Sequence, residues 1–128
     1  AGVHSLGAAA KWIKEVTYKD IQECEAEFFN MLKEKGLFEI EELKLIGNIM
    51  PRSVYTFTID DYHPSDVAGF LDLDNVCVRT GHLCAYPASN KYSGGKGVFR
   101  VSSAPYNDEH DCVMLVEGLW KAIEKIKK

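Results

Sequence analysis

The sequence predicts an α/β fold, more narrowly an α+β two-layer sandwich with helices packed on a small mixed or antiparallel sheet. Two observations lead to this prediction. The chain of 128 residues begins and ends in segments with apolar residues at helical spacing, and its middle holds short runs of β-branched and aromatic residues. No repeat and no linker long enough to divide the chain is present, so we expect one domain, residues 1–128.

The N-terminal third predicts two helices. The first runs from Ser5 to about Val16, where apolar residues recur at helical spacing. Thr17 stands in the N-cap position of the second, Tyr18–Lys35, and Gly36 ends it. The apolar face of the second helix consists of Ile21, Cys24, Phe28 and Leu32.

The middle of the chain predicts an irregular region with strand-like pieces, two clearer strands and a short helix. Residues 37–50 are irregular, with strand-like pieces around Phe38–Ile40 and Lys44–Ile46. Ser53–Asp60 alternates with period two and is the clearest strand. A turn then leads into a helix over Ser65–Leu73, and Val76–Arg79 follows as a short strand.

The last third predicts a loop, a strand and a helix. Pro87–Gly97 is polar and rich in glycine, so we expect a mobile loop. Val98–Ser102 predicts a strand, and Asn107 is expected to cap a final helix from Asp108 to about Lys127. The apolar stripe of this helix consists of Cys112, Leu115, Val116, Leu119, Ile123 and Ile126.

Composition and charge exclude several classes of function. The formal net charge is −4, which argues against nucleic acid or an anionic membrane as a partner. No run approaches the roughly 20 apolar residues of a membrane span, and the start lacks the pattern of a signal peptide. The four cysteines show no CxxC, so we expect reduced thiols and a cytoplasmic location. Because the chain begins almost directly in a helical pattern, we expect a fragment or a processed chain.

The stretch VRTGHLCAYP, residues 78–87, holds the main candidate for chemistry. Cys84 follows a predicted strand, and its simplest interpretation is a passive small residue, since most free cysteines are inert. The alternative is a nucleophile: Arg79 and His82 supply positive potential that favours a thiolate, and Gly81 allows an unusual turn. The residues alone leave both interpretations open.

Arg100 is the second candidate. It shares a strand face with Val98 and Ser102, while Phe99 and Val101 point the opposite way. A cation in mid-strand is either surface-facing or in a structural ion pair, or it holds a substrate carboxylate through two parallel hydrogen bonds.

Metal and phosphate sites are not expected. Two His-x-Cys pairs occur, His82 with Cys84 and His110 with Cys112. The second pair lies on a predicted helix, where residues two apart point about 200° away from each other and cannot share one ion. The stretch SGGKG, residues 93–97, lacks the spacing of a phosphate loop and is interpreted as flexible.

Three further residues are assigned to the fold. His63, before Pro64, is expected to be a turn or capping residue. Trp12 and Trp120 are expected to be packing residues.

Taken together, the motifs carry a resemblance to a known family. The string HPSDVAGFLDLDNVCVRTGHLCAYP, followed by FRVSSAPYND and a final amphipathic helix, resembles the C-terminal small domain of Suf-type cysteine desulfurases. These enzymes belong to the class V aminotransferase family, of fold type I, whose cofactor is pyridoxal phosphate. The N-terminal GVHSLGAAAKWIKEV also resembles the family helix that enters this domain, so the resemblance covers nearly the whole chain.

The resemblance implies roles for the candidate residues. Cys84 would be the nucleophile that takes sulfur from L-cysteine as a persulfide and leaves L-alanine, for iron–sulfur cluster assembly or another sulfur transfer. Arg100 would bind the substrate carboxylate, and Arg79 and His82 would line the site. A sulfur-acceptor protein is the implied partner. Leu83 stands where the family usually has a second histidine, and the stretch after Cys84 also differs in detail.

The resemblance also implies that the cofactor site lies elsewhere. In the family, the lysine that binds pyridoxal phosphate and most phosphate ligands belong to a large domain, which this chain lacks and which would be supplied in cis or in trans. None of the lysines here matches that position, so the chain alone is expected neither to bind the cofactor nor to be active. The alternatives are a selenocysteine lyase, another class V relative, a stand-alone persulfide carrier or an interaction domain.

Overall fold

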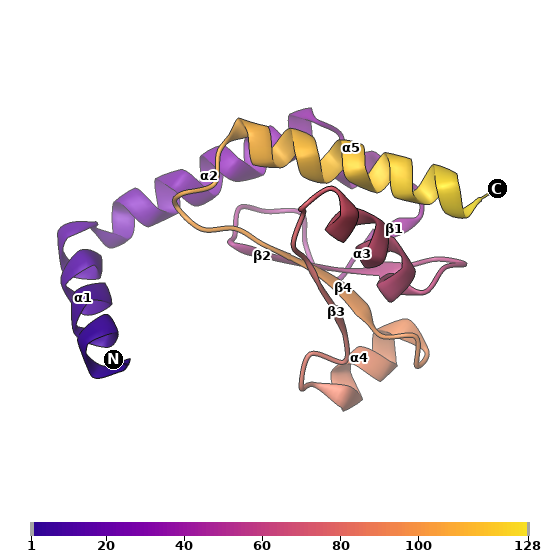
Figure 1. Cartoon of the computed structure of the whole chain (residues 1–128), viewed down its shortest axis with the longest axis horizontal. Helices are drawn as coiled ribbons and strands as arrows, with labels where there is room; N and C mark the ends of the chain where they lie inside the picture. Colours follow the sequence, from indigo (N-terminus) through magenta and orange to yellow (C-terminus); the bar gives the residue numbers. More distant parts are fainter. Residues whose placement is uncertain (1, 128) are drawn as a thin grey trace.

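The computed structural model describes residues 2–127 and contains five α-helices, one short 3-10 helix and four strands (Figure 1). In chain order the elements are α1 (Gly2–Glu15), α2 (Tyr18–Glu34), η1 (Leu37–Glu39), β1 (Leu43–Leu45), β2 (Val54–Ile59), α3 (Pro64–Leu73), β3 (Arg79–Gly81), α4 (Tyr86–Ser93), β4 (Val98–Ser102) and α5 (Glu109–Ile126).

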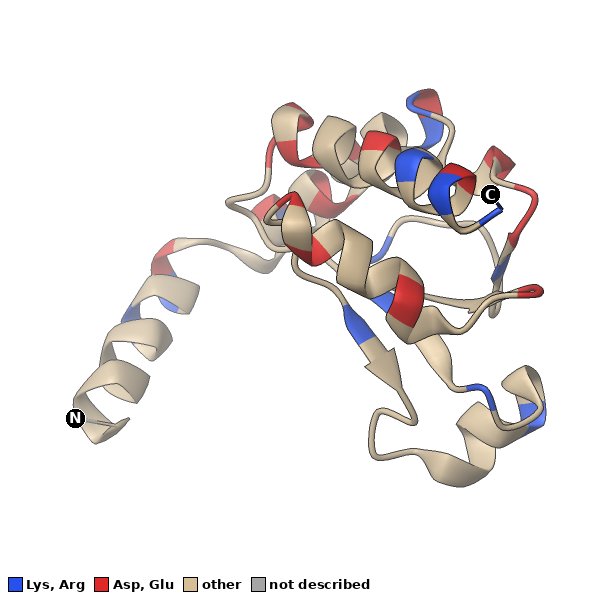
Figure 2. Cartoon of the chain, turned by 45° about the vertical axis from the view of Figure 1, so that its right-hand side comes forward, with Lys and Arg blue, Asp and Glu red and all other residues tan. Residues whose placement is uncertain are grey.

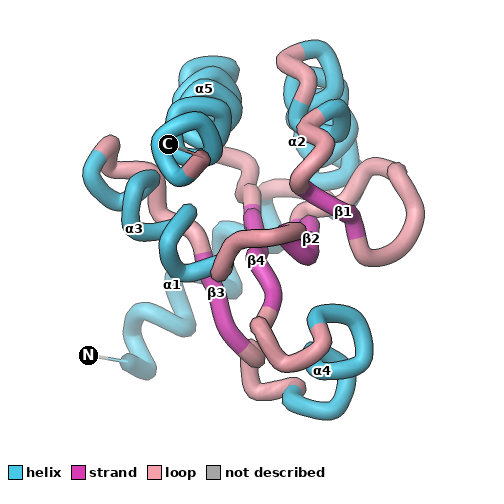
Figure 3. Tube along the Cα trace, turned by 90° about the vertical axis from the view of Figure 1, so that its right-hand side faces the viewer, coloured by secondary structure: helices cyan, strands magenta, loops and turns pink. Residues whose placement is uncertain are grey.

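The strands form one antiparallel sheet in the order β1-β2-β4-β3. Helices α2 and α5 lie side by side over one face of this sheet, and α4 lies on the other side (Figure 3). The predicted α/β architecture with a small sheet is therefore confirmed, and of the two predicted sheet types the antiparallel one is present.

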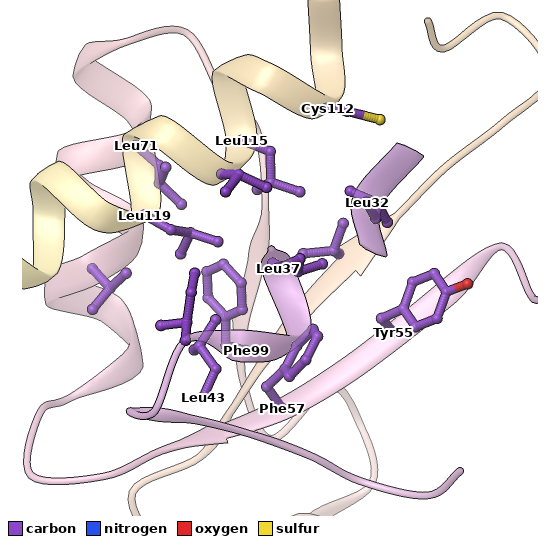
Figure 4. Packing of buried hydrophobic residues seen from close by; sticks show 14 of the residues in the cluster. Leu32, Leu37, Leu43, Tyr55, Phe57, Leu71, Phe99, Cys112, Leu115 and Leu119 are labelled. Carbon is purple, nitrogen blue, oxygen red and sulfur yellow. The ribbon is translucent and has the colours of Figure 1, made fainter. Parts of the chain in front are cut away.

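The core lies between the sheet and helices α2, α3 and α5. Because side chains alternate along a strand, Tyr55 and Phe57 of β2 and Phe99 of β4 point to the same face, where each is at most 1% exposed. They meet Leu32 of α2 and Leu119 of α5 (Figure 4). Burial of each such side chain contributes about 1.5–3 kcal/mol relative to exposure. Their strand neighbours consequently point to the opposite face.

Both long helices begin with a capping box. The Thr17 side chain accepts a hydrogen bond from the backbone N–H of Asp20, and the Asp20 carboxylate accepts one from Thr17, as the sequence predicted for this cap. For α5 the predicted cap is wrong by one residue, because Asp108 rather than Asn107 pairs with Asp111. Asn107 instead closes the preceding turn, since its Oδ1 accepts from the backbone N–H of Ala104 at 2.8 Å.

Two predicted strands differ in the structure. Phe38–Ile40 is not a strand, since Leu37–Glu39 forms the 3-10 turn η1 after Gly36 and the Phe38 ring packs 5.7 Å from that of Phe29. The strand predicted over Val76–Arg79 begins only at Arg79. The backbone N–H of Val76 donates to Leu71 at the end of α3, so Val76 closes that helix instead of pairing in the sheet.

The predicted loop Pro87–Gly97 is also wrong, because Tyr86–Ser93 forms helix α4. Pro87 lies in the first turn, where a missing N–H costs no intrahelical bond, and Gly94 ends the helix with φ 58°. Ser89 and Ser93 are helical although serine is common in loops. Proline at the start and glycine just past the end were the signal for this helix.

Helix α1 projects away from the other elements and buries none of its residues (Figure 1). Trp12 on α1 and Trp120 on α5 are 46% and 47% exposed, so neither is the packing residue that the sequence predicted. The helix predicted from Ser5 does form, but it starts three residues earlier, at Gly2. Within residues 2–127, no helix combines the length and the apolar character needed to cross a bilayer.

Candidate functional site

Cys84 lies at the tip of a tight turn between β3 and α4. The backbone N–H of Ala85 donates to the carbonyl of His82 at 2.9 Å, and the two residues between them, Leu83 and Cys84, have φ 52° and 59°. Positive φ at both central positions characterises a type I′ turn, which costs about 1–2 kcal/mol for each residue that is not glycine. The surrounding structure must therefore hold this turn, and it leaves Cys84 exposed.

Leu83 anchors the turn. Its half-buried side chain lines a hollow of about 240 Å³ between α4 and the sheet, together with Val98, Ala88 and Tyr92. His82 lines the same hollow, and its ring lies 4.7 Å from the ring of Tyr86, measured between centroids. Adjacent residues of the turn thus divide their roles: Leu83 packs against apolar side chains, and Cys84 faces solvent.

Two glycines form a narrow neck where the chain leaves and re-enters the sheet. Gly81 and Gly97 have φ 99° and 86°, and a Cβ on Gly97 would lie 3.0 Å from the Cα of Gly81. The Ser93 hydroxyl accepts from the backbone N–H of Gly97 at 3.0 Å and donates to the carbonyl of Ser89. Residues 82–96, called the excursion below, therefore leave the sheet at one tight point. The unusual backbone predicted for Gly81 is confirmed.

Arg79 and Arg100 lie side by side on the sheet face that points away from the core. They are Cα partners in the antiparallel register of β3 and β4, so their side chains project to the same side. Like charges directly opposite each other repel. Within residues 2–127 neither arginine is in an ion pair with a carboxylate, and the Nε of Arg100 is buried without a hydrogen-bond partner. The face therefore carries two neighbouring cations that no carboxylate of the described residues neutralises.

The segment that contains Cys84 and both arginines carries only positively charged side chains. Residues 75–107 contain four cationic side chains and no aspartate or glutamate, whereas the remaining chain has 11 cations and 19 acids. The four are Arg79, Lys91, Lys96 and Arg100. Figure 2 shows the acidic residues on the helices above the sheet and near the β-strand loops, with only blue positions on β3 and the excursion. The interpretation of the sequence missed this asymmetry, because the net charge averages it away.

The other cysteines differ from Cys84 in exposure. All four thiols are free, as expected from the sequence, but Cys112 is fully buried, and burial raises its pKa to about 11. Cys24 is half-buried, and Cys77 is exposed beside a separate hollow of about 440 Å³ below the start of α5. His63 caps α3 by accepting a hydrogen bond from Ser65, as predicted.

The candidate residues lie near one another without direct bonds to the thiol. No hydrogen bond or ion pair in the described part of the chain joins Cys84 to Arg79, His82 or Arg100, although all four lie on β3, β4 and the turn between them. The same residues 2–127 contain no group of three or more metal-ligating side chains.

The model of the class-V aminotransferases matches residues 1–115. The chain belongs to this family. A probable cysteine desulfurase of Halalkalibacterium halodurans is 35% identical over 124 residues, 97% of this chain and 30% of that protein. A cysteine desulfurase of Pectobacterium atrosepticum is 33% identical over 92% of this chain and 28% of its own length. The chain thus spans about 30% of the curated relatives it matches.

Solved structures confirm the fold. A cysteine desulfurase of Escherichia coli superposes with a TM-score of 0.79 at 22% identity, covering 94% of this chain and 29% of that one. The apo cysteine desulfurase of Thermococcus onnurineus gives a TM-score of 0.76 at 28% identity, over 90% of this chain and 29% of the other. The antiparallel sheet and its helical layer are therefore an arrangement found within cysteine desulfurases.

Pyridoxal phosphate is the cofactor of this family, but the described residues do not fit a site for it. The cofactor requires a lysine to hold its aldehyde carbon within an enclosed pocket. No lysine lines the hollow beside Leu83 or the larger hollow below α5. Lys35, Lys44 and Lys127 are instead in surface ion pairs with carboxylates. The described residues thus provide an exposed thiol and two unpaired arginines, and no lysine placed to hold the cofactor.

Proposed function

We propose that the chain is the C-terminal small domain of a Suf-type cysteine desulfurase. In this proposal Cys84 takes sulfur from L-cysteine as a persulfide and leaves L-alanine, and the sulfur passes on for iron–sulfur cluster assembly or another sulfur transfer. The observation that carries the proposal is the unpaired couple Arg79 and Arg100, on the same sheet face and next to the turn that exposes Cys84. The relatives named cysteine desulfurase support it.

The chain's own residues suit this chemistry. Arg100, with Arg79, holds the substrate carboxylate and so orients the substrate toward the turn. The Cys84 thiolate forms an S–S bond with the substrate sulfur while the C–S bond breaks. The electron pair of that bond stays with carbon, which gains a proton and becomes the methyl group of alanine. His82 lines the site and belongs to the same tight turn as Cys84.

Electron withdrawal by pyridoxal phosphate, which makes such a C–S bond labile, would come from a cofactor domain in cis or in trans. The chain alone is therefore expected to form no alanine from L-cysteine, even with added cofactor. Turnover by the isolated chain would contradict this part of the proposal and would require a cofactor site that the described residues do not provide.

Mass spectrometry tests the role of Cys84 directly. The chain is incubated with inorganic polysulfide, and we expect a mass increase of about 32 Da, one sulfur atom, on the peptide that contains Cys84. A Cys84→Ser variant should lose this adduct, and Cys77, which is also exposed, serves as the internal reference. An adduct no more abundant on Cys84 than on Cys77 would overturn the assignment of the nucleophile.

A further inference from the structure

The excursion presents its cations and aromatic side chains to solvent together. Lys91 and Lys96 are exposed, and within residues 2–127 neither is in an ion pair. Tyr86 and Tyr92 are 59% and 54% exposed, and the ammonium group of Lys91 lies 5.7 Å from the ring centre of Tyr92. Exposed tyrosines are enriched at protein-binding surfaces, and unpaired lysines beside them attract an acidic partner.

This surface surrounds Cys84 rather than lying elsewhere on the molecule. Cys84 is the third residue of the excursion and α4 begins two residues later, so a partner that reaches the thiol also meets α4. The acidic side chains, which outnumber the cations in the remaining chain, lie on other elements (Figure 2). An incoming partner consequently experiences positive potential at the thiol and negative potential over the helical layer.

We propose that the excursion is a docking surface for a sulfur-acceptor protein whose reactive thiol is flanked by acidic side chains. The inference rests on the proposed function, in that it takes Cys84 as the sulfur donor. Charge complementarity selects this partner: an acidic patch is attracted to the excursion and repelled by the rest of the chain, so electrostatic forces both speed and orient the encounter. The tyrosines supply apolar contact once the partner is seated.

The proposed sulfur transfer conserves atoms and electrons. The acceptor thiolate attacks the outer sulfur of the Cys84 persulfide and forms a new S–S bond with it. The bond between that sulfur and Cys84 Sγ breaks, and its electron pair leaves with Cys84 as a thiolate. The acceptor ends as a persulfide, so no external oxidant or reductant takes part.

Two model acceptors test the proposal. They are synthetic peptides of equal length with one cysteine each, flanked by aspartates in one and by lysines in the other. The full chain, with Cys24 and Cys77 replaced by serine, is loaded with persulfide at Cys84, and sulfur transfer to each peptide is followed by mass spectrometry. Each rate is divided by the rate of the same peptide with 2-hydroxyethyl disulfide, which removes intrinsic differences between the two thiols.

We expect the acidic peptide to react about tenfold faster at low ionic strength, and the preference to vanish near 1 M salt, where the Debye length is about 3 Å. Lys91→Glu and Lys96→Glu should each lower the preference about threefold. Lys11→Glu on the projecting helix α1 is the matched control and should leave the preference unchanged. A preference for the basic peptide, equal rates, or an equal effect of Lys11→Glu would overturn the proposal.

A second arm separates this inference from the proposed function. Cys84 is converted to its mixed disulfide with thionitrobenzoate, and release of the coloured leaving group by each peptide is measured. If no persulfide forms but the charge preference persists here, the sulfur-donor role fails and the docking surface stands. If an equimolar single-stranded oligonucleotide abolishes the preference, the surface binds nucleic acid instead, and the proposal is wrong.

Discussion

The two faces of the sheet are built for different purposes. The face toward α2 and α5 carries aromatic and aliphatic side chains that are almost completely buried. The opposite face carries Thr56, Arg100 and Arg79 in one row across three strands, all at least partly accessible. Because side chains alternate along β4, Phe99 and Arg100 are adjacent in sequence yet belong to these two different environments. A four-stranded sheet thus separates the residues that stabilise the fold from those proposed to act on substrate.

The largest expected effect comes from the covered face. Phe99→Ala removes a fully buried ring and should lower the free energy of unfolding by about 3–5 kcal/mol, because the space it leaves is only partly refilled. Arg100→Ala, one residue away on the open face, should change it by no more than about 0.5 kcal/mol. Urea denaturation of both variants measures the difference. Similar losses for the two would mean that Arg100 also supports the fold.

The neck of the excursion should give the next largest effect. Gly97→Ala combines a positive φ with a Cβ placed 3.0 Å from the backbone of Gly81, and should cost about 2–4 kcal/mol. Gly94→Ala also requires a positive φ, but nothing lies within 4 Å of its Cβ, so about 1 kcal/mol is expected. Thermal unfolding compares the two. Equal costs would show that the contact at the neck contributes nothing beyond backbone strain.

The smallest effect on stability is expected at the N-terminal cap of α5, the helix that packs on the covered face. Hydrogen bonds from Asn107 and from the backbone of Asp108 lower the pKa of Asp111 below its usual 3.8. A lowered folded-state pKa stabilises the protein above the unfolded-state value, and this contribution disappears as the pH falls through the folded value. Asp111→Asn should therefore lower the melting temperature near neutral pH, and the difference from the native sequence should shrink below about pH 4. A constant difference across this range would contradict a role for the charge.

Much of the fold could be predicted because local patterns and tertiary packing agree. The alternation in Ser53–Asp60 and the capping signal at Thr17 correspond to elements whose burial also requires them. Helix α4 could not be recognised from composition, because its serines and asparagine favour loops and only its ends carry helix signals. Strand β3 starts only at Arg79 because the backbone N–H of Val76 donates a hydrogen bond to Leu71 of α3. The hydrophobic pattern of the sequence does not predict this contact.

The sequence proposes residues for the candidate site but does not predict their geometry. Cys84, Arg79, His82 and Arg100 were identified from local sequence and from the family resemblance. Their arrangement follows from the register of β3 with β4, which sequence alone did not provide. Leu83 was noted only as a departure from the family pattern, and its role as the apolar anchor of the turn required the positive φ values and the hollow beneath α4.

The neck formed by Gly81 and Gly97 also bears on how such a protein can change over generations. Since residues 82–96 pack on the sheet face opposite the core cluster and contribute no residue to it, substitutions within them are transmitted poorly to the hydrophobic core. The length and surface of this segment can diversify while the rest of the fold stays the same. A lineage can in this way remodel the surface around Cys84 by altering about fifteen residues, without having to evolve a new scaffold.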